Sequence, residues 1–143
     1  SKYYRKIEGV DLSKDMLIQA EKKKIYNKLY HQEIVDFLKK NDLDFDVIIS
    51  ADVFIYVGDL AEIFCLIKAK NKRSGYLVFS TEHTEKGENF FLERSARYSH
   101  SKEYIEKLCK QFDYKIFHFE KINLRKEYEQ FLIGGIYILQ FYI

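Results

Sequence analysis

DFDVIISADVFIYVGD, residues 44–59, is the stretch that decides the fold. Its centre, residues 45–49, is apolar and rich in β-branched side chains without strict alternation, which is typical of a strand buried on both faces of a parallel sheet. Asp52 follows where this strand would end, and ligands of open α/β sheets bind just outside the carboxyl ends of the strands. Gly58 then breaks the run, and a capping-box pattern that starts at Asp59 indicates a helix. The stretch therefore predicts a strand–loop–helix unit with an acid at the strand tip.

The composition is that of one globular domain. The chain has 143 residues, of which 47% are hydrophobic, and we expect one domain over residues 1–143. The formal charge of only +2 gives no support to nucleic acid or an anionic membrane as a partner. Cys65 and Cys109 lie in apolar helical patterns without ligand spacing, so we expect no metal site and the reduced thiols of a cytoplasmic protein. The longest uncharged run, residues 130–143, is too short to cross a bilayer as a helix.

The residues before the central stretch predict two strand–helix units. We expect a strand over 6–11 that ends in Asp11, followed by a helix capped by Ser13 with a narrow apolar stripe. A second strand is expected within 27–33, with a short helix over 35–40 after it.

The residues after the stretch predict further alternating elements and a closing hairpin. These are a helix from Leu60, a strand over 76–79, a polar loop over 83–99 with a short helical piece, a helix from Ser101, a strand over 114–123, a charged turn over 125–129 and a final strand up to Ile143. The final strand has almost no polar side, so we place it inside the sheet. The element order predicts an α/β fold with a three-layer, mostly parallel sheet and a C-terminal antiparallel β-hairpin.

Five segments, taken together, match a known family. They are GVDLS at 9–13, ML at 16–17, DVIISADVFIYVGDL at 46–60, GYLVFSTE at 75–82 and RYSHS at 97–101. On these segments the chain resembles the class I S-adenosylmethionine-dependent methyltransferases, in particular the predicted methyltransferases attached to tetratricopeptide repeats. The resemblance runs nearly from end to end and implies a Rossmann-like sheet with S-adenosylmethionine as the methyl donor.

The resemblance implies a cofactor site that begins at Asp11. This acid corresponds to the one that binds the ribose, and a carboxylate suits that role because it can accept both hydroxyl groups. Leu12 and Met16 would pack on the face of the adenine. The residue types alone leave two alternatives open: Asp11 as a helix-capping acid and Met16 as ordinary core.

Two later segments complete the implied site. Glu33 resembles the family's acid near the adenine amino group, with the backbone amide of Ile34 beside it. Asp52, Val53 and Tyr56 resemble the segment where the methionine part of the cofactor and the methyl acceptor meet. Glu33 as a solvated loop acid and Asp52 as a turn former remain the alternatives.

Methyl transfer from a sulfonium requires little chemistry of the protein beyond positioning and exclusion of water. A base is needed only where the acceptor must lose a proton. Glu82, His83 and His100 lie on segments expected at the same end of the sheet, and each is a candidate for that base. A surface or capping role is the alternative for each, so the catalytic residue and the methyl acceptor stay unassigned.

One part of the family pattern is missing. The family has a first strand and a Gly-rich turn ahead of the position of Gly9, whereas only residues 1–8 precede it here and no Gly-x-Gly occurs. We therefore expect an N-terminally truncated methyltransferase fold with impaired cofactor binding. The missing strand would lie between the strands that end at Asp11 and before Asp52. We expect these two strands to pair directly, or a homodimer to repair the gap.

Two hypotheses of function follow, and a third is weaker. The first is an S-adenosylmethionine-dependent methyltransferase of unknown acceptor. The second is a catalytically inactive remnant of that fold that acts as an interaction or dimerisation module. The third is a phospho-receiver domain with Asp52 as the phosphate acceptor. It is weaker because this chain lacks the paired acids and the lysine that such a site requires.

Overall fold

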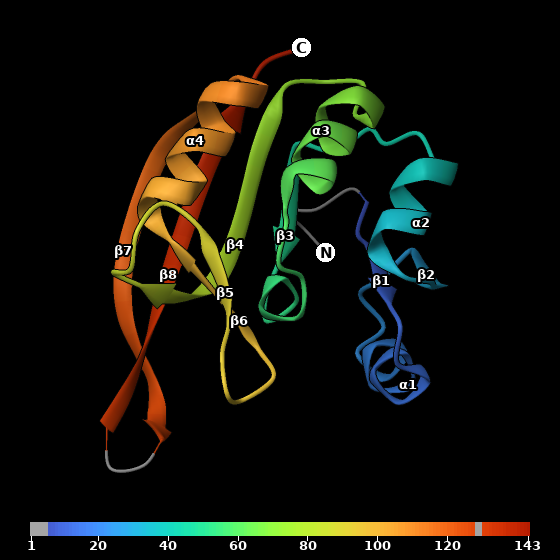
Figure 1. Cartoon of the computed structure of the whole chain (residues 1–143). Helices are drawn as coiled ribbons and strands as arrows, with labels where there is room; N and C mark the ends of the chain where they lie inside the picture. The colour runs from blue at the N-terminus through green and yellow to red at the C-terminus, as the bar shows by residue number, and fades with distance from the viewer. Residues whose placement is uncertain (1–5, 128–129) are drawn as a thin grey trace. The chain divides into compact units, whose positions relative to one another are not determined.

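The computed structural model describes residues 6–127 and 130–143. They form two compact units, one ending at Asp42 and the other beginning at Leu43. Strands and helices alternate along the chain (Figure 1), which confirms the predicted α/β fold. Each unit has a sheet of its own. Within the described residues, no helix combines the length and apolar character that a membrane crossing requires.

The smaller unit is built on two parallel strands. Its elements are β1 (Glu8–Asp11), α1 (Lys14–Lys22), β2 (Lys28–His31) and α2 (Ile34–Lys40). β1 pairs with β2 in a register that places Asp11 opposite His31. The rings of Tyr30 and Phe37 pack with their centroids 4.7 Å apart, whereas α1 buries no residue. All four elements lie where the sequence predicts them.

The larger unit is built on a six-stranded sheet. Its elements are β3 (Val47–Ser50), the 3-10 helix η1 (Phe54–Tyr56), α3 (Ala61–Lys70), β4 (Gly75–Thr84), β5 (Phe90–Leu92), β6 (Tyr98–Ser101), α4 (Lys102–Phe112), β7 (Tyr114–Glu127) and β8 (Gln130–Phe141). The terminal hairpin of β7 and β8 is confirmed. The charged turn expected over 125–129 includes residues 128 and 129, which lie outside the described residues.

β4 is the central strand of this sheet. One of its edges pairs antiparallel with β8, from Gly75 to Glu82. Its other edge is shared by two parallel neighbours, β3 beside residues 76–79 and β6 beside residues 82–84. β8 in turn pairs with β7, so the final strand lies inside the sheet, as its apolar character predicts. The sheet is therefore mixed, with β3 and β6 parallel to β4 and β8 antiparallel to it.

Both helices of the larger unit cover the same face of the sheet (Figure 1). The ring centroid of Phe64 on α3 lies 5.9 Å from that of Phe79 on β4 and 5.0 Å from that of Tyr114 on β7. Leu77 and Leu139 are fully buried on this face, and each side chain stabilises the fold by about 1.5–3 kcal/mol. Taken by itself this unit has two layers, because none of its described helices covers the opposite face.

β3 differs from the sequence prediction of a strand buried on both faces. Val47 and Ile49 are 47% and 71% exposed. β3 pairs only with β4 among the described residues, so its second edge is open. β1, which ends at Asp11, belongs to the other sheet, and the expected direct pairing of these two strands is wrong. The apolar character of residues 45–49 therefore predicts the strand correctly but not its neighbours.

The segment over 83–99 also differs from its prediction as a loop with a helical piece. β4 runs on to Thr84, and residues 90–92 and 98–101 form the antiparallel pair β5 and β6. No helix forms in this segment. β6 pairs with β4 in a register that places His100 beside His83. Two of the candidate bases thus lie on neighbouring strands.

Candidate functional site

The turn after β1 is folded around Asp11. Its Oδ1 accepts the backbone N–H of Ser13 at 2.8 Å, and Oγ of Ser13 accepts the backbone N–H of Met16 at 3.3 Å. Asp11 therefore shapes the turn into α1, as its capping alternative predicts, but it does so through one oxygen. Oδ2 has no partner in the described part of the chain and remains available to a ligand.

Leu12 and Met16 lie on the surface beside this turn. They are 66% and 58% exposed, respectively. The alternative that Met16 is core is therefore wrong. Exposed apolar side chains next to a carboxylate can cover the flat face of a ring, and binding a ring would bury them.

Glu33 is the N-cap of α2. Its two carboxylate oxygens accept the backbone N–H groups of Val35 at 2.9 Å and Asp36 at 3.0 Å. This side chain is therefore held by the start of its own helix while it remains partly exposed to solvent. Ile34 is the first residue of α2, where backbone N–H groups have no acceptor within the helix. Whether Glu33 and Ile34 also hold a ligand stays a prediction.

The carboxyl ends of β1 and β2 are held together by the backbone and by His31. Nε2 of His31 lies 2.8 Å from the carbonyl oxygen of Leu12, and the backbone N–H of Gln32 donates to the carbonyl of Asp11 at 3.1 Å. Asp11 and Glu33 consequently follow adjacent strands at one edge of the small sheet. No pattern in the sequence distinguishes His31, because its position opposite Asp11 depends on the pairing register of β1 and β2.

Asp52 follows β3 in a left-handed conformation, with φ of 55°. Aspartate tolerates this region better than most residues, which agrees with the turn-former alternative. Its backbone N–H donates to Oγ of Ser80 on β4 at 3.1 Å. The exposed carboxylate has no partner within the described residues, so the turn conformation leaves it free for a ligand.

The short helix η1 then orients the remaining predicted side chains. Phe54 and Ile55 are buried, at 1% and 7% exposure, while Val53 and Tyr56 point outward at 38% and 67%. The N-cap of α3 is Leu60, so the expected cap at Asp59 is wrong by one residue, although Oδ1 of Asp59 accepts the backbone N–H of Ala61 at 2.9 Å. Phe54 and Ile55 thus anchor η1 in the core, while Val53 and Tyr56 face the solvent.

Glu82 and His100 are buried and the side chain of His83 is 3% exposed, which contradicts the alternative of surface residues for all three candidate bases. Glu82 is 2% exposed and forms an ion pair with Arg97, which follows β5. This pair attaches the β5–β6 turn to β4. Because burying a carboxylate requires a partner of opposite charge, Glu82 has a clear structural role.

His100 is fully buried and holds the segment before α3. Its Nε2 lies 3.0 Å from the carbonyl oxygen of Val57 and 2.9 Å from that of Gly58. Burial lowers the pKa of His100, although the two carbonyl oxygens oppose this shift. A neutral imidazole that donates Nε2–H to these oxygens accounts for the geometry.

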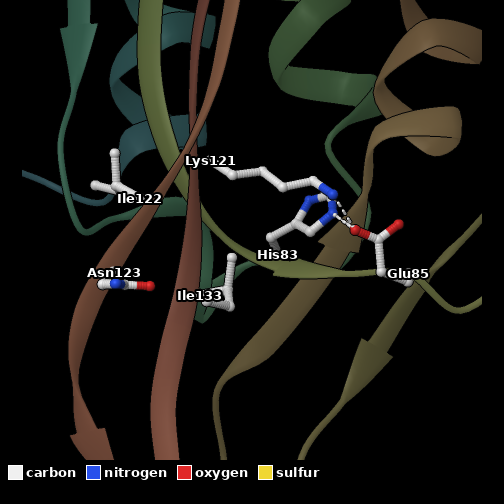
Figure 2. A pocket seen from close by; sticks show the side chains of 6 residues that line it. All are labelled: His83, Glu85, Lys121, Ile122, Asn123 and Ile133. Carbon is white, nitrogen blue, oxygen red and sulfur yellow. Dashed lines mark hydrogen bonds and ion pairs between the residues drawn. The ribbon is translucent and has the colours of Figure 1, made fainter.

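His83 lies at a pocket near the carboxyl end of β4. Figure 2 shows its ring beside Glu85, which directly follows β4, and Lys121, which reaches it from β7. Nε2 of His83 lies 2.9 Å from Oε1 of Glu85, which also accepts a hydrogen bond from Nζ of Lys121. The His83 side chain is 3% exposed. Among the described residues, no group of His, Cys, Asp or Glu side chains has an arrangement suited to a metal ion.

A family model described as a methyltransferase domain matches residues 3–133 of the chain. The chain belongs to this methyltransferase family. An uncharacterized protein of Haemophilus influenzae is 36% identical over 85 residues, which cover 54% of this chain and 34% of the relative. The methyltransferase chain therefore spans about a third of the length of that curated relative.

Solved structures agree on the methyltransferase fold. An S-adenosylmethionine-dependent methyltransferase from Clostridium acetobutylicum has a TM-score of 0.70 at 20% identity, over 97% of this chain and 76% of that one. A magnesium protoporphyrin IX methyltransferase from Synechocystis with bound SAM has a TM-score of 0.66 at 16% identity, over 97% and 61% of the chains. At these identities the likeness establishes the Rossmann-like fold.

The predicted cofactor residues of this methyltransferase fall into two groups. Asp11, Leu12, Met16, Glu33 and Ile34 belong to the smaller unit, and Asp52, Val53 and Tyr56 belong to the larger one. Within each group the residues follow the carboxyl ends of parallel strands, as expected of ligands in such sheets. Their roles as cofactor ligands remain predictions.

Proposed function

We propose that this chain binds S-adenosylmethionine and takes part in methyl transfer to an acceptor molecule. The observation that carries the proposal is the turn at Asp11, where a carboxylate with an unpaired oxygen follows a parallel strand. Membership of the methyltransferase family supports it. We also propose that the intact protein is an active methyltransferase and that it is related to the methyltransferases attached to tetratricopeptide repeats. The methyl acceptor stays unassigned.

The residues of the smaller unit fit a nucleoside. Oδ2 of Asp11 can accept hydrogen bonds from a ribose, and Leu12 and Met16 offer apolar surface to a base. The N-terminal backbone of α2, at Ile34, offers N–H donors. The bound cofactor would supply the activated methyl group, and these residues would bind and orient it.

A second candidate function is a non-catalytic interaction or dimerisation module. The observation that favours it is β3, whose second edge is open and whose Ile49 is 71% exposed. Unpaired strands with exposed apolar side chains accept a strand from another chain. In this second function, two copies of the chain form a homodimer through the open edge of β3.

Calorimetry with S-adenosylhomocysteine tests the first function. Asp11→Asn keeps an oxygen for the Ser13 N–H but removes the charge, so the turn should persist while affinity falls. We expect a loss of about 1.5–3 kcal/mol, the usual contribution of a charged hydrogen-bond partner. Asp15→Ala, which changes a nearby exposed acid on α1, serves as the matched control and should leave affinity unchanged.

Two results would count against this function. Absence of binding at millimolar ligand would remove the cofactor from this chain, and equal affinities of the Asp11 and Asp15 variants would remove Asp11 from the site. The solution mass, measured over a range of concentrations, tests the second function. A monomer at every concentration would exclude dimerisation through β3.

A further inference from the structure

The η1 segment, residues 52–58, carries the predicted site residues of the larger unit, and its backbone is held at both ends. At its start, the backbone N–H of Asp52 donates to Oγ of Ser80 on β4 at 3.1 Å. At its end, Nε2 of His100 on β6 lies 3.0 and 2.9 Å from the carbonyl oxygens of residues 57 and 58. Side chains from two different strands thus anchor one short segment.

The η1 segment begins beside an opening in the sheet. β3 accompanies β4 only as far as Phe79, and β6 joins β4 only from Glu82 onwards. On this edge, residues 80–81 have no neighbouring strand within the described part of the chain. The chain leaves β3 after Ser50, next to this opening, and η1 contacts both β4 and β6. The position of the segment therefore depends on side chains, because no strand pairing holds its backbone.

The two anchors act from opposite faces of the sheet. Successive side chains of a strand point to alternate faces, so Ser80 and His83, three residues apart on β4, point to opposite ones. His100 is in register with His83 and shares its face. Ser80 and His100 consequently hold the segment from both sides, and the loss of either would leave it free to turn about the other.

The middle of the η1 segment is fixed by packing and by its own backbone. Phe54 is 1% exposed, and its ring centroid lies 5.0 Å from that of Phe79 on β4. The backbone N–H of Tyr56 donates to the carbonyl of Val53 at 3.0 Å. The N–H of Val57 donates to the carbonyl of Phe54, also at 3.0 Å. Because the carbonyl of Val57 is one of the two that the histidine binds, this anchor continues directly into the turn.

The absence of a side chain at Gly58 allows the second anchor to approach. A Cβ atom at this position would lie 2.8 Å from ring atoms of both Phe90 and Tyr98, well inside the usual contact distance of about 3.5–4.0 Å between carbon atoms. The ring of His100 packs on the same cluster, with its centroid 6.2 Å from that of Phe90. The β5–β6 pair therefore rests directly on the backbone that it anchors.

We propose that Ser80 and His100 are positioning residues of the methyltransferase site, which fix the η1 segment so that its predicted site residues keep one arrangement toward the cofactor and the acceptor. This inference rests on the proposed methyl transfer. Val53 and Tyr56 are 38% and 67% exposed, so the packing of their own side chains does not fix them. Because methyl transfer depends mainly on position, an unanchored segment should weaken the site without any loss of a ligand contact.

Amide hydrogen exchange followed by NMR tests the anchors without a ligand. Ser80→Ala removes the acceptor and should speed exchange at Asp52, whereas His100→Leu removes the donor and should speed exchange at Tyr56 and Val57. We expect each effect to be about three- to tenfold, as for one lost hydrogen bond, beyond any change at the amides of β4 and β8. Those amides report the opening of the whole unit. Ser80→Thr and His100→Gln keep the hydrogen-bonding atoms and should restore slow exchange.

Thr84 supplies a matched control on the same strand. Its Oγ1 also accepts a backbone N–H, that of Lys86, at 3.1 Å, and Thr84→Val should leave exchange in the η1 segment unchanged. If Ser80→Ala and His100→Leu reduce protection equally in the segment and in the β4–β8 pair, the two residues only stabilise the unit, and the proposal is wrong.

Calorimetry with S-adenosylhomocysteine connects the anchors to the site. Ser80→Ala and His100→Leu should bind about three- to tenfold more weakly than the wild type, while Ser80→Thr and His100→Gln should recover most of the affinity. Wild-type affinity in the two truncated variants would overturn this inference and leave the proposed function standing. Absence of binding by the wild type would overturn the proposed function, and the role of both residues in methyl transfer would fall with it, even if the exchange data show an anchored segment.

Discussion

The side-chain amide of Asn71 pairs with the backbone of Phe45 in both directions. Oδ1 of Asn71 accepts the Phe45 N–H at 2.9 Å, and Nδ2 donates to the Phe45 carbonyl at 2.9 Å. Nδ2 also donates to the carbonyl of Arg73 at 2.7 Å, and Asn71 is 3% exposed. This amide therefore replaces the backbone of a neighbouring strand just before β3 begins, and it connects the end of α3 to the start of β4.

Asn71→Ala should destabilise the larger unit by about 2–4 kcal/mol, because three part-buried backbone groups lose their partner at once. Urea unfolding followed by circular dichroism measures the loss. Asn41→Ala is a suitable comparison, since the Asn41 side chain makes a single bond, from Nδ2 to the carbonyl of Phe37 at 2.8 Å. A smaller effect of Asn71→Ala than of Asn41→Ala would contradict the bridging role.

Ile49→Thr should change stability by less than about 0.5 kcal/mol, because the side chain is 71% exposed on the uncovered face of β3. Leu77→Ala, at the adjacent strand and fully buried, should cost about 2–5 kcal/mol. Chemical denaturation of both variants against the wild type gives the comparison. A large loss with Ile49→Thr would mean that β3 is covered in solution, as the apolar run in the sequence suggests.

The contrast between these two residues shows what the sequence can and cannot predict. The β-branched run at 45–49 identifies a strand because backbone preference is local. Whether the face of β3 that carries Ile49 is covered depends on elements far away in sequence or on another chain. Likewise the terminal hairpin is predictable, because its two strands are adjacent in sequence. The polar sequence of β6, which includes Tyr98 and His100, predicts a loop, because its strand conformation depends on pairing with the distant strand β4.

The candidate site divides in the same way. Asp11 and Asp52 are predictable because each is an acid at or just after the end of a strand, which is a local pattern, and because both belong to segments that carry the family resemblance. Glu85 and Lys121 are not, since 36 positions separate them and only the pairing of the sheet brings both to His83. The burial of Glu82 depends similarly on Arg97, 15 positions later.

The stability of the larger unit should fall as the pH is lowered from about 7 to 5. Burial lowers the pKa of His100 below its ordinary value of 6.5, so the unfolded chain binds a proton at this position before the folded chain does. The stabilisation by the neutral ring is fully present above about pH 6.5 and is lost as the pH falls toward the folded pKa. Urea unfolding at several pH values measures this slope.

His100→Gln keeps a donor for the Val57 and Gly58 carbonyls but does not titrate, so it should flatten the slope between pH 7 and 5. His118→Gln is the matched control, because His118 is half exposed on β7, and it should keep the wild-type slope. Identical pH dependence of the two variants would show that His100 is not the group that titrates.

Glu33 offers a way to separate a structural role from a binding role. Glu33→Ala removes both acceptors at the start of α2 and should destabilise the smaller unit by about 0.5–2 kcal/mol, whereas Glu33→Ser restores a capping oxygen and should recover most of that loss. If Glu33 also holds the adenine amino group, Glu33→Ser should still bind S-adenosylhomocysteine more weakly than the wild type in calorimetry. If the serine variant matches the wild type in both stability and affinity, the carboxylate of Glu33 serves only as the cap, and the binding role predicted from the family resemblance would be wrong.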